Sequence, residues 1–467
     1  MEKNLDKSHA MGTDSIGRLM LRFSLPAIVG MVANALYNIV DRLFVGQTVG
    51  AAGIGAISVV FPFTIMVIAF GLLIGVGAGS YISISLGEKK HARAEKAMGN
   101  AIVLLLCGGA VLTLLGVLFA EPILVLSGAS ETLLPMSLEY MGYVVWGVFF
   151  STLAFGLNFF IRAEGNPRYA MFTLIIGAGA NVALDAYFIL GLDMGVAGAA
   201  IATLISQVIS AAWAVMFYVR RRGTLRFRAK NLSLEWPVIR RILAVGAAPA
   251  LTEVSFTYIL IVFNRTLRFY GGDLAISAMG IFFSLDSLFF LPVLGLAGGV
   301  QPIISYNYGA KNYDRVIRSV LAAIKIGALF FTASFALVML VPDYMIRLFN
   351  SDNAELMAMG ARGMRLGYCG IIMASVSLVA SHTFQAIGKA RIGLFLTLSR
   401  HFLFILLPLF LLPPILGIDG VWLSMPLSDL GGALAGGWFL RREFREMRSS
   451  EALLRLVPAE GCGGSPD

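Results

Sequence analysis

The chain contains about twelve apolar segments, each of the length that crosses a lipid bilayer as a helix. A spanning helix needs about 20 mainly apolar residues. The approximate cores of these segments are 19–44, 52–79, 99–120, 137–160, 169–190, 196–219, 242–268, 274–300, 317–341, 357–386, 393–416 and 418–440. Hydrophobic residues make up 58% of the chain and charged residues only 13%, well below the share of charge in soluble domains. The sequence therefore predicts an all-α integral membrane protein embedded in a lipid bilayer.

The loops between the segments alternate in charge. Those that follow the even-numbered segments are basic and contain or are flanked by Lys89, Arg162, Arg168, Arg220, Lys311, Lys389 and Arg441. The intervening loops are short or acidic, as at Glu121 and Asp343. The positive-inside rule then predicts a multi-pass protein of the bacterial inner (cell) membrane with both termini in the cytoplasm. The net charge of +9 follows from this topology, so no nucleic-acid partner is expected.

The two halves of the sequence resemble each other at a displacement of roughly 220 residues, an internal symmetry typical of transporters. Residues 23–27 (FSLPA) correspond to 246–250 (GAAPA), and 162–168 (RAEGNPR) to 385–391 (QAIGKAR). An even number of segments in each half makes the repeats parallel, which predicts two pseudo-symmetric six-helix lobes around a central cavity. The expected parts are a cytoplasmic N-terminal segment (1–18), an N-lobe (19–222), a cytoplasmic linker (223–240), a C-lobe (241–442) and a cytoplasmic C-terminal tail (443–467).

The first segment carries an acid. Asp41 shares one helical face with Asn34, Tyr37 and Asn38, which precede it at spacings of seven, four and three residues. An acid in hydrocarbon costs about 2.5–3.5 kcal/mol on insertion scales, so it normally serves ions, protons or charged substrates. Pro26, earlier in the same segment, removes a helix hydrogen bond and allows the helix to bend, although a passive kink is the ordinary alternative.

The other polar groups of the first half fit the same purpose. Asn181 and Asp185 share a face of the fifth segment, Thr203 and Gln207 share a face of the sixth, and Asn158 lies in the fourth. Carboxylate, amide and hydroxyl oxygens suit a proton or a hard monovalent cation rather than a soft metal. Two acids close together in a low dielectric do not both ionise readily, so a proton, a sodium ion or a cationic substrate would relieve their repulsion.

These residues also have a structural interpretation, in which each amide makes a helix–helix hydrogen bond, and for any single amide we favour it. The two aspartates are different, because basic residues that could pair with them are scarce: among the N-lobe cores only the first contains any, Arg22 and Arg42. The internal repeat places Asn264 and Pro408 at the positions equivalent to Asp41 and Asp185. A structural requirement of the repeat would appear in both halves, whereas a site need appear only once.

The second half contains Glu253, Asp286 and Asp429, with Arg400 and His401 in the eleventh segment. Here an internal network of ion pairs is the stronger interpretation, because Arg400 can neutralise an acid. For Glu253, contact with a substrate or an ion is an equal alternative.

Several motifs are absent from the sequence. It contains no GxxxxGK[ST] loop and no HExxH, which argues against ATP-driven pumping and zinc-dependent proteolysis. We therefore expect no enzyme, no cofactor other than H⁺ or Na⁺ as a coupling ion, and no metal site beyond Na⁺ at the cation site.

Six motifs together resemble those of one transporter family. They are 37–46 (YNIVDRLFVG), 75–80 (GVGAGS), 86–87 (LG), 162–165 (RAEG), 301–311 (QPIISYNYGAK) and 426–429 (PLSD). The chain resembles the multidrug and toxic compound extrusion (MATE) family, in its MepA-like and DinF-like bacterial branches, over about residues 15 to 445. The resemblance implies a two-lobed antiporter that exports amphiphilic, often cationic drugs in exchange for protons or sodium ions.

The resemblance also implies roles for individual residues. The positions that match the N-lobe cation site are Asp41, Asn181, Asp185 and Thr203, and Tyr37, Asn158 and Pro26 match positions linked to that site or to bending of the first helix. Another branch uses a C-lobe site with a glutamate in segment seven, which Glu253 could match, and an aspartate in segment ten, which this chain lacks.

Three functions remain in competition at this point. The leading one is a multidrug antiporter that works as a monomer by alternating access. A flippase for lipid-linked sugars is the nearest rival, and a basic central cavity would favour it. A membrane-embedded transferase would need a convergent nucleophile or base, and the sequence offers none that is convincing.

Overall fold

The computed structural model describes residues 10–49, 51–127, 129, 131, 133–347 and 354–456. This part of the chain is helical and contains no strand, which confirms the predicted all-α class. The N-lobe consists of α2 (Ile16–Thr48), α3 (Ala51–Gly87), α4 (His91–Leu118), α5 (Ala120–Leu126), α6 (Leu134–Ala163), α7 (Pro167–Asp185), η1 (Ala186–Gly191) and α8 (Gly195–Val219). The connection η2 (Ala229–Leu232) leads to the C-lobe: α9 (Trp236–Gly309), α10 (Tyr313–Leu340), α11 (Pro342–Arg347), α12 (Ala354–Tyr368), α13 (Ile371–Ala386), α14 (Ala390–Leu398), η3 (Ser399–Ile405), α15 (Leu406–Leu411), α16 (Pro413–Leu416) and α17 (Ile418–Leu456).

All twelve predicted segments lie on these helices. Ten helical stretches of the described chain are long and apolar enough to cross a membrane, and α12 with α13, bent by 51°, makes an eleventh. Two of the ten belong to α9, which is broken at Gly272, where a φ of 67° is open to glycine at little cost. The last predicted segment is the start of α17 but is not among the eleven, because glycines, serines and two aspartates interrupt its apolar residues.

The turns that join the helices repeat their geometry in the two halves. Lys89 follows α3 with a φ of 60°, and Lys311 follows α9 with a φ of 59°. Gly165 after α6 and Gly388 after α13 have φ values of 84° and 76°. Left-handed backbone is uncommon outside glycine. Its recurrence at equivalent positions supports the internal repeat found in the sequence.

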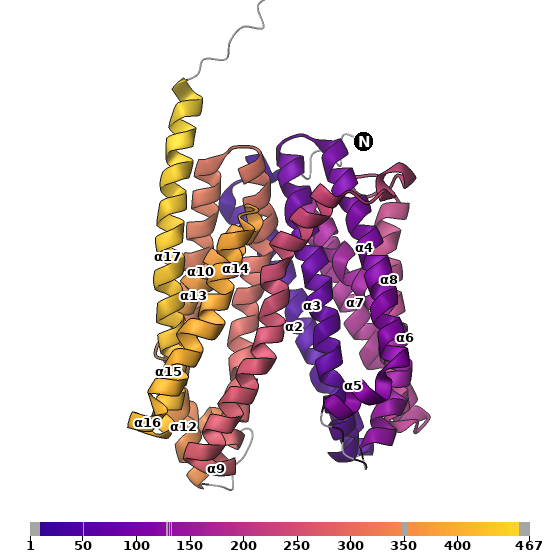
Figure 1. Cartoon of the computed structure of the whole chain (residues 1–467), viewed down its shortest axis with the longest axis vertical. Coiled ribbons are helices and arrows are strands. Elements are labelled where there is room, and N and C mark those ends of the chain that lie inside the picture. Colours follow the sequence, from indigo (N-terminus) through magenta and orange to yellow (C-terminus); the bar gives the residue numbers. More distant parts are fainter. Residues whose placement is uncertain are drawn as a thin grey trace, which may run out of the picture.

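The two lobes meet at one end of the molecule and diverge at the other (Figure 1). At the meeting end, helix α3 of the N-lobe packs on α9 of the C-lobe through paired glycines. A Cβ added to Gly87 would lie 2.0 Å from the carbonyl oxygen of Tyr306, and one added to Gly309 would lie 2.1 Å from that of Ile84. The two contacts are related by the internal repeat, so the interface is pseudo-symmetric. We call this end, which also carries the first and last described helical turns, the closed end.

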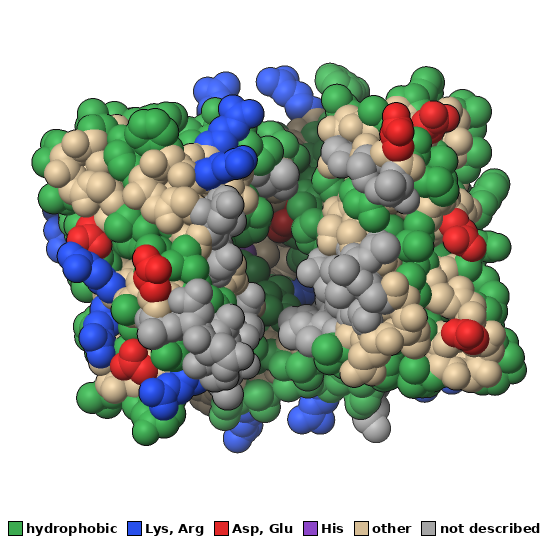
Figure 2. All heavy atoms as spheres, turned by 90° about the horizontal axis from the view of Figure 1, so that it is seen from below, with side chains coloured by type: hydrophobic (Ala, Val, Ile, Leu, Met, Phe, Trp, Pro, Cys, Tyr) green, Lys and Arg blue, Asp and Glu red, His purple; other side chains and the backbone are tan. Residues whose placement is uncertain are grey.

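The opposite, open end exposes the space between the lobes. Figure 2 views the molecule from this end and shows it hollowed between the two halves, with acidic and basic side chains visible inside. A cavity of about 390 Å³ is lined mostly by the C-lobe, from α9, α13, η3 and α17, and on its N-lobe side by Met31, Leu72, Val76, Phe159 and Arg162. The predicted central cavity between two lobes is thus present.

Candidate functional site

The two N-lobe aspartates lie close enough to interact electrostatically, although they are far apart in sequence. Asp41 is in the second half of α2, and Asp185 is the last residue of α7, where the helix widens into the π-helical turn η1. Their exposed fractions are 7% and 0%. Both carboxylate oxygens of Asp185 are buried and accept no hydrogen bond from the described part of the chain. π-helical turns inside α-helices are frequent at functional sites, because they re-aim the side chains around them.

An amide and a hydroxyl complete this cluster. Asn181, one turn before Asp185 on α7, points its Nδ2 at the hydroxyl of Thr203 on α8, at 3.5 Å. The Asn181 side-chain oxygen is buried and accepts no hydrogen bond from the described residues. The structure therefore brings together Asp41, Asn181, Asp185 and Thr203, the four residues that the sequence predicted as a cation site.

Tyr140 on α6 is a member of the cluster that the sequence analysis missed. Its side chain interacts electrostatically with Asp41, Asp185 and Tyr37, and it lies beside the side chain of Thr203. The only signal in the sequence was a tyrosine within an apolar segment, and Tyr143 in the same segment gave the same signal although it is exposed. Only the packing of α6 against neighbouring helices, among them α7 and α8, separates the two.

The other predicted residues of the N-lobe lie in varied positions. Asn158 donates to the backbone oxygen of Ala170 at 2.6 Å and so ties α6 to α7. The side-chain oxygen of Gln207 is buried against α6 and accepts no hydrogen bond from the described residues. Pro26 is buried within α2, which continues as a helix on both sides. The side chains of Asn34 and Asn38 lie outside the described residues.

The cluster is poor in metal ligands. No group of three or more His, Cys, Asp or Glu side chains lies together in the described part of the chain. Two carboxylates with one amide and two hydroxyls are chemically suited to a proton or a monovalent cation, which needs oxygen ligands and little charge.

The C-lobe acids line the central cavity. Asp286 accepts a hydrogen bond from the Tyr368 hydroxyl at 2.9 Å, and Asp429 pairs with Arg400 at 3.0 Å. These two acids therefore belong to an internal network, as the structural interpretation predicted. Glu253 also lines the cavity, and within the described chain it makes no ion pair.

Arg162 lies beside a loop, as the sequence predicted, but its side chain is directed into the molecule. It is in the last turn of α6, at the end of the stretch Leu134–Ala163 that is long and apolar enough to cross a membrane, and it lines the central cavity. The helix continues beyond the last apolar run and ends only at the left-handed turn of Gly165.

Glu164 is a second buried charge that the sequence analysis did not single out. It follows α6, outside the spanning stretch, and accepts hydrogen bonds from the Leu225 backbone N–H at 2.9 Å and the Thr224 hydroxyl at 3.1 Å. It thereby fixes the start of the inter-lobe connection to the N-lobe. Burial raises the pKa of this carboxyl to about 7 despite these donors.

Comparison with known proteins identifies the family. The MatE family model matches residues 26–187 and 249–409, one match in each lobe. The chain belongs to the MatE family. This confirms the resemblance seen in the sequence motifs, and the family's two matches coincide with the internal repeat.

The multidrug export protein MepA of Staphylococcus haemolyticus is 28% identical over 415 residues, which cover 89% of this chain and 91% of that protein. MepA of Staphylococcus aureus strain NCTC 8325 is 27% identical over 420 residues, covering 90% and 92%. The family and these relatives are transporters, not enzymes.

Solved structures share the fold. A MATE protein in complex with MaL6 has a TM-score of 0.89 at 24% identity, covering 94% of this chain and 99% of that one. A MOP superfamily transporter from Pyrococcus furiosus has the same score and identity, covering 94% and 98%. This similarity confirms the two-lobed architecture.

Proposed function

We propose that this protein is a secondary active multidrug efflux transporter that exchanges protons or sodium ions for amphiphilic, often cationic compounds by alternating access. The cation site consists of Asp41, Asn181, Asp185 and Thr203, with Tyr140 as a further contact. Membership of the MatE family and the similarity to proteins named multidrug export protein support the transport class.

One observation carries the assignment of the site. Asp185 is fully buried, interacts with a second carboxylate, and receives no hydrogen bond on either oxygen from the described residues. Two neighbouring buried carboxylates are costly when both are ionised and no cation is present. Binding of a proton or Na⁺ removes this cost. None of the four residues of the cation site lines the cavity of about 390 Å³, so the ion and the exported compound occupy separate places, and exchange requires that binding of one favours release of the other.

The energetics of exchange constrain the coupling. A membrane potential supplies about 2.3 kcal/mol per charge per 100 mV. When one coupling ion enters and one monovalent cation leaves, the membrane potential contributes nothing net, so the concentration gradient of the ion must drive export.

The orientation in the membrane follows from the predicted topology. With both termini in the cytoplasm of the inner membrane, the open end faces outward. The protein works as a monomer.

The experiment that tests the proposal is ethidium transport in proteoliposomes, under a pH gradient and a sodium gradient imposed separately. Asp41→Asn and Asp185→Asn are each expected to abolish gradient-driven transport while leaving expression intact. Asp193→Asn is the matched control, because Asp193 is exposed and its φ of 52° is one that asparagine tolerates. Transport that ignores both gradients would refute antiport, and normal transport by either variant would remove that aspartate from the site.

The flippase alternative receives less support from the cavity. A lipid-linked sugar carries phosphates and would be matched by a basic cavity. The cavity here contains Arg162 and Arg400 but also three acids, and Arg400 is paired with Asp429. The balance of charge therefore favours the multidrug transporter.

A further inference from the structure

Arg162 is an unusual arginine, because it lies at the lobe junction without an acidic partner. Its guanidinium stacks over the ring of Phe159, with 4.2 Å between the central carbon and the ring centroid. Its Nε is buried and makes no hydrogen bond within the described residues, and no carboxylate there forms an ion pair with it. The guanidinium is always charged and carries five N–H donors. A charge in a largely buried position without a partner is costly, and binding of an opposite charge would offset that cost.

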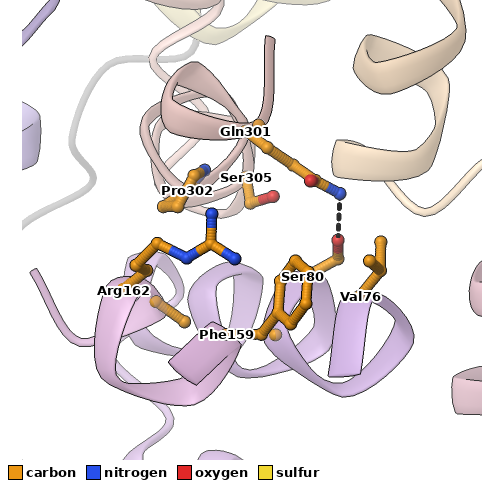
Figure 3. A pocket seen from close by; sticks show the side chains of 10 residues that line it. Val76, Ser80, Phe159, Arg162, Gln301, Pro302 and Ser305 are labelled. Carbon is orange, nitrogen blue, oxygen red and sulfur yellow. Dashed lines mark hydrogen bonds between the residues drawn. The ribbon is translucent and has the colours of Figure 1, made fainter. Parts of the chain in front are cut away.

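The residues around Arg162 form a small polar pocket beside the central cavity, where α3, α6 and α9 meet. Figure 3 shows Arg162 from α6 pointing between Ser80 on α3 and Gln301, Pro302 and Ser305 on α9. The Gln301 amide donates to the Ser80 hydroxyl at 3.1 Å, which fixes one wall of the pocket across the two lobes. The free volume beside Arg162 is about 10 Å³, enough for one water-sized group.

This pocket opens into the larger cavity. Phe159, Arg162, Gly298 and Gln301 line both. The larger cavity, of about 390 Å³, has the size of sites for drug-like molecules, and aromatic rings including those of Phe256, Phe282 and Phe290 line it. Glu253, the acid without an ion pair, lies in the same cavity. One chamber is thus lined by an unpaired cation from the N-lobe, an unpaired acid from the C-lobe and several aromatic rings.

We propose that Arg162 binds the carboxylate of the transported compound, so that the preferred substrates are zwitterionic aromatic amphiphiles rather than simple cations. The carboxylate reaches the guanidinium at the lobe junction, the aromatic body occupies the larger cavity, and the positive group faces Glu253. A carboxylate oxygen fits the small volume beside Arg162. This inference rests on the proposed function, because it specifies the substrate class of the same cavity.

The test uses three dyes with one ring skeleton and different charges. A rhodamine with a free benzoate is zwitterionic, its methyl ester keeps only the positive charge, and fluorescein keeps only negative charge. Binding to purified protein in detergent, without any gradient, is followed by fluorescence polarisation. Wild type is expected to bind the zwitterion about tenfold or more tightly than the ester, since a hydrogen bond to a charged group contributes about that much.

Variants assign this preference to residues. Arg162→Gln is expected to lose the preference for the zwitterion over the ester by weakening binding of the zwitterion, and Arg162→Lys to keep part of the preference. Glu253→Gln is expected to reduce the preference for the zwitterion over fluorescein. Arg168→Gln, at an exposed position six residues along the chain, is the control.

The outcomes separate this inference from the proposed function. If wild type binds the ester as tightly as the zwitterion, the carboxylate subsite is refuted whatever the variants do, even if they fail to fold. Preferred binding of fluorescein would also refute it, in favour of an anion site. If the preference is present but neither gradient drives transport of any dye, the subsite holds and the antiport mechanism fails.

Discussion

The glycine contacts at the closed end lead to a prediction about conformation. A Cβ on Gly309 would lie 2.1 Å from the Ile84 carbonyl oxygen, so Gly309→Ala requires α3 and α9 to separate by about 1 Å before contact becomes normal. Backbone lies on both sides of this contact, so no side chain can move aside. Only the conformation in which the lobes meet at this end contains the contact. The substitution therefore penalises this conformation and not one in which the closed end has opened.

The size of the effect follows from two opposing contributions. Overpacking costs about 1–3 kcal/mol. Alanine in place of glycine within a helix gains about 1 kcal/mol, but it gains this in both conformations and cancels. A penalty near 2 kcal/mol shifts the equilibrium between the two conformations by about 30-fold. Gly87→Ala is expected to act in the same way, because its contact with Tyr306 is the pseudo-symmetric equivalent.

The assay is a distance distribution between spin labels at the open end. Leu126 on α5 and Phe269 on α9 are 91% and 82% exposed and lie on different lobes. They are replaced by cysteine in a chain whose own Cys107, Cys369 and Cys462 are serine. Double electron–electron resonance should show one long distance for wild type and a new shorter distance for Gly309→Ala, as the open end closes.

Gly437→Ala on α17 is the control, because an added Cβ there meets nothing within 4 Å. Its distance distribution and drug transport should match those of wild type. Identical distributions for Gly309→Ala and Gly437→Ala, in a protein that still folds, would refute the view that the glycine pairs hold the lobes together.

Three further predictions concern the connection between the lobes and the cation site. The pKa of Glu164 is raised from 4.5 to about 7, so its contribution to stability is complete below pH 4.5 and is lost as the pH rises through about 7. In wild type the free energy of unfolding should therefore fall by up to about 3 kcal/mol over this range, and Glu164→Gln should remove this fall, as measured by thermal unfolding in detergent. An equal pH dependence of stability in both proteins would contradict the assignment. The side-chain oxygen of Asn100 accepts a hydrogen bond from the Glu235 backbone N–H at 2.7 Å and so holds the inter-lobe connection. Asn100→Ala removes this acceptor and should destabilise the fold by about 1–3 kcal/mol and speed trypsin cleavage of the connection. An unchanged cleavage rate would count against this role of Asn100. Tyr140→Phe should weaken the dependence of ethidium transport on the coupling ion without changing expression, and an unaltered ion dependence would exclude the hydroxyl from the site.

Much of the architecture could be predicted from the sequence because the signals are local. Partitioning into lipid depends on each segment's own composition, so all twelve predicted segments are helical and the break at Gly272 falls between the seventh and eighth. The internal repeat and the family motifs could also be read directly along the chain. The acids Asp41 and Asp185 stood out because charge is rare in such segments.

The packing of the helices decided what the sequence left open. It placed Tyr140 rather than Tyr143 beside the aspartates, paired Asp429 with Arg400, and left Glu253 without an ion pair in the described chain. It also directed Arg162, which the sequence predicted only to flank a loop, into the central cavity. Composition and periodicity determine that a helix forms and crosses the membrane, since both depend on neighbours in sequence. Which faces of different helices meet depends on side-chain and backbone contacts between distant segments, and only the tertiary structure contains those distances.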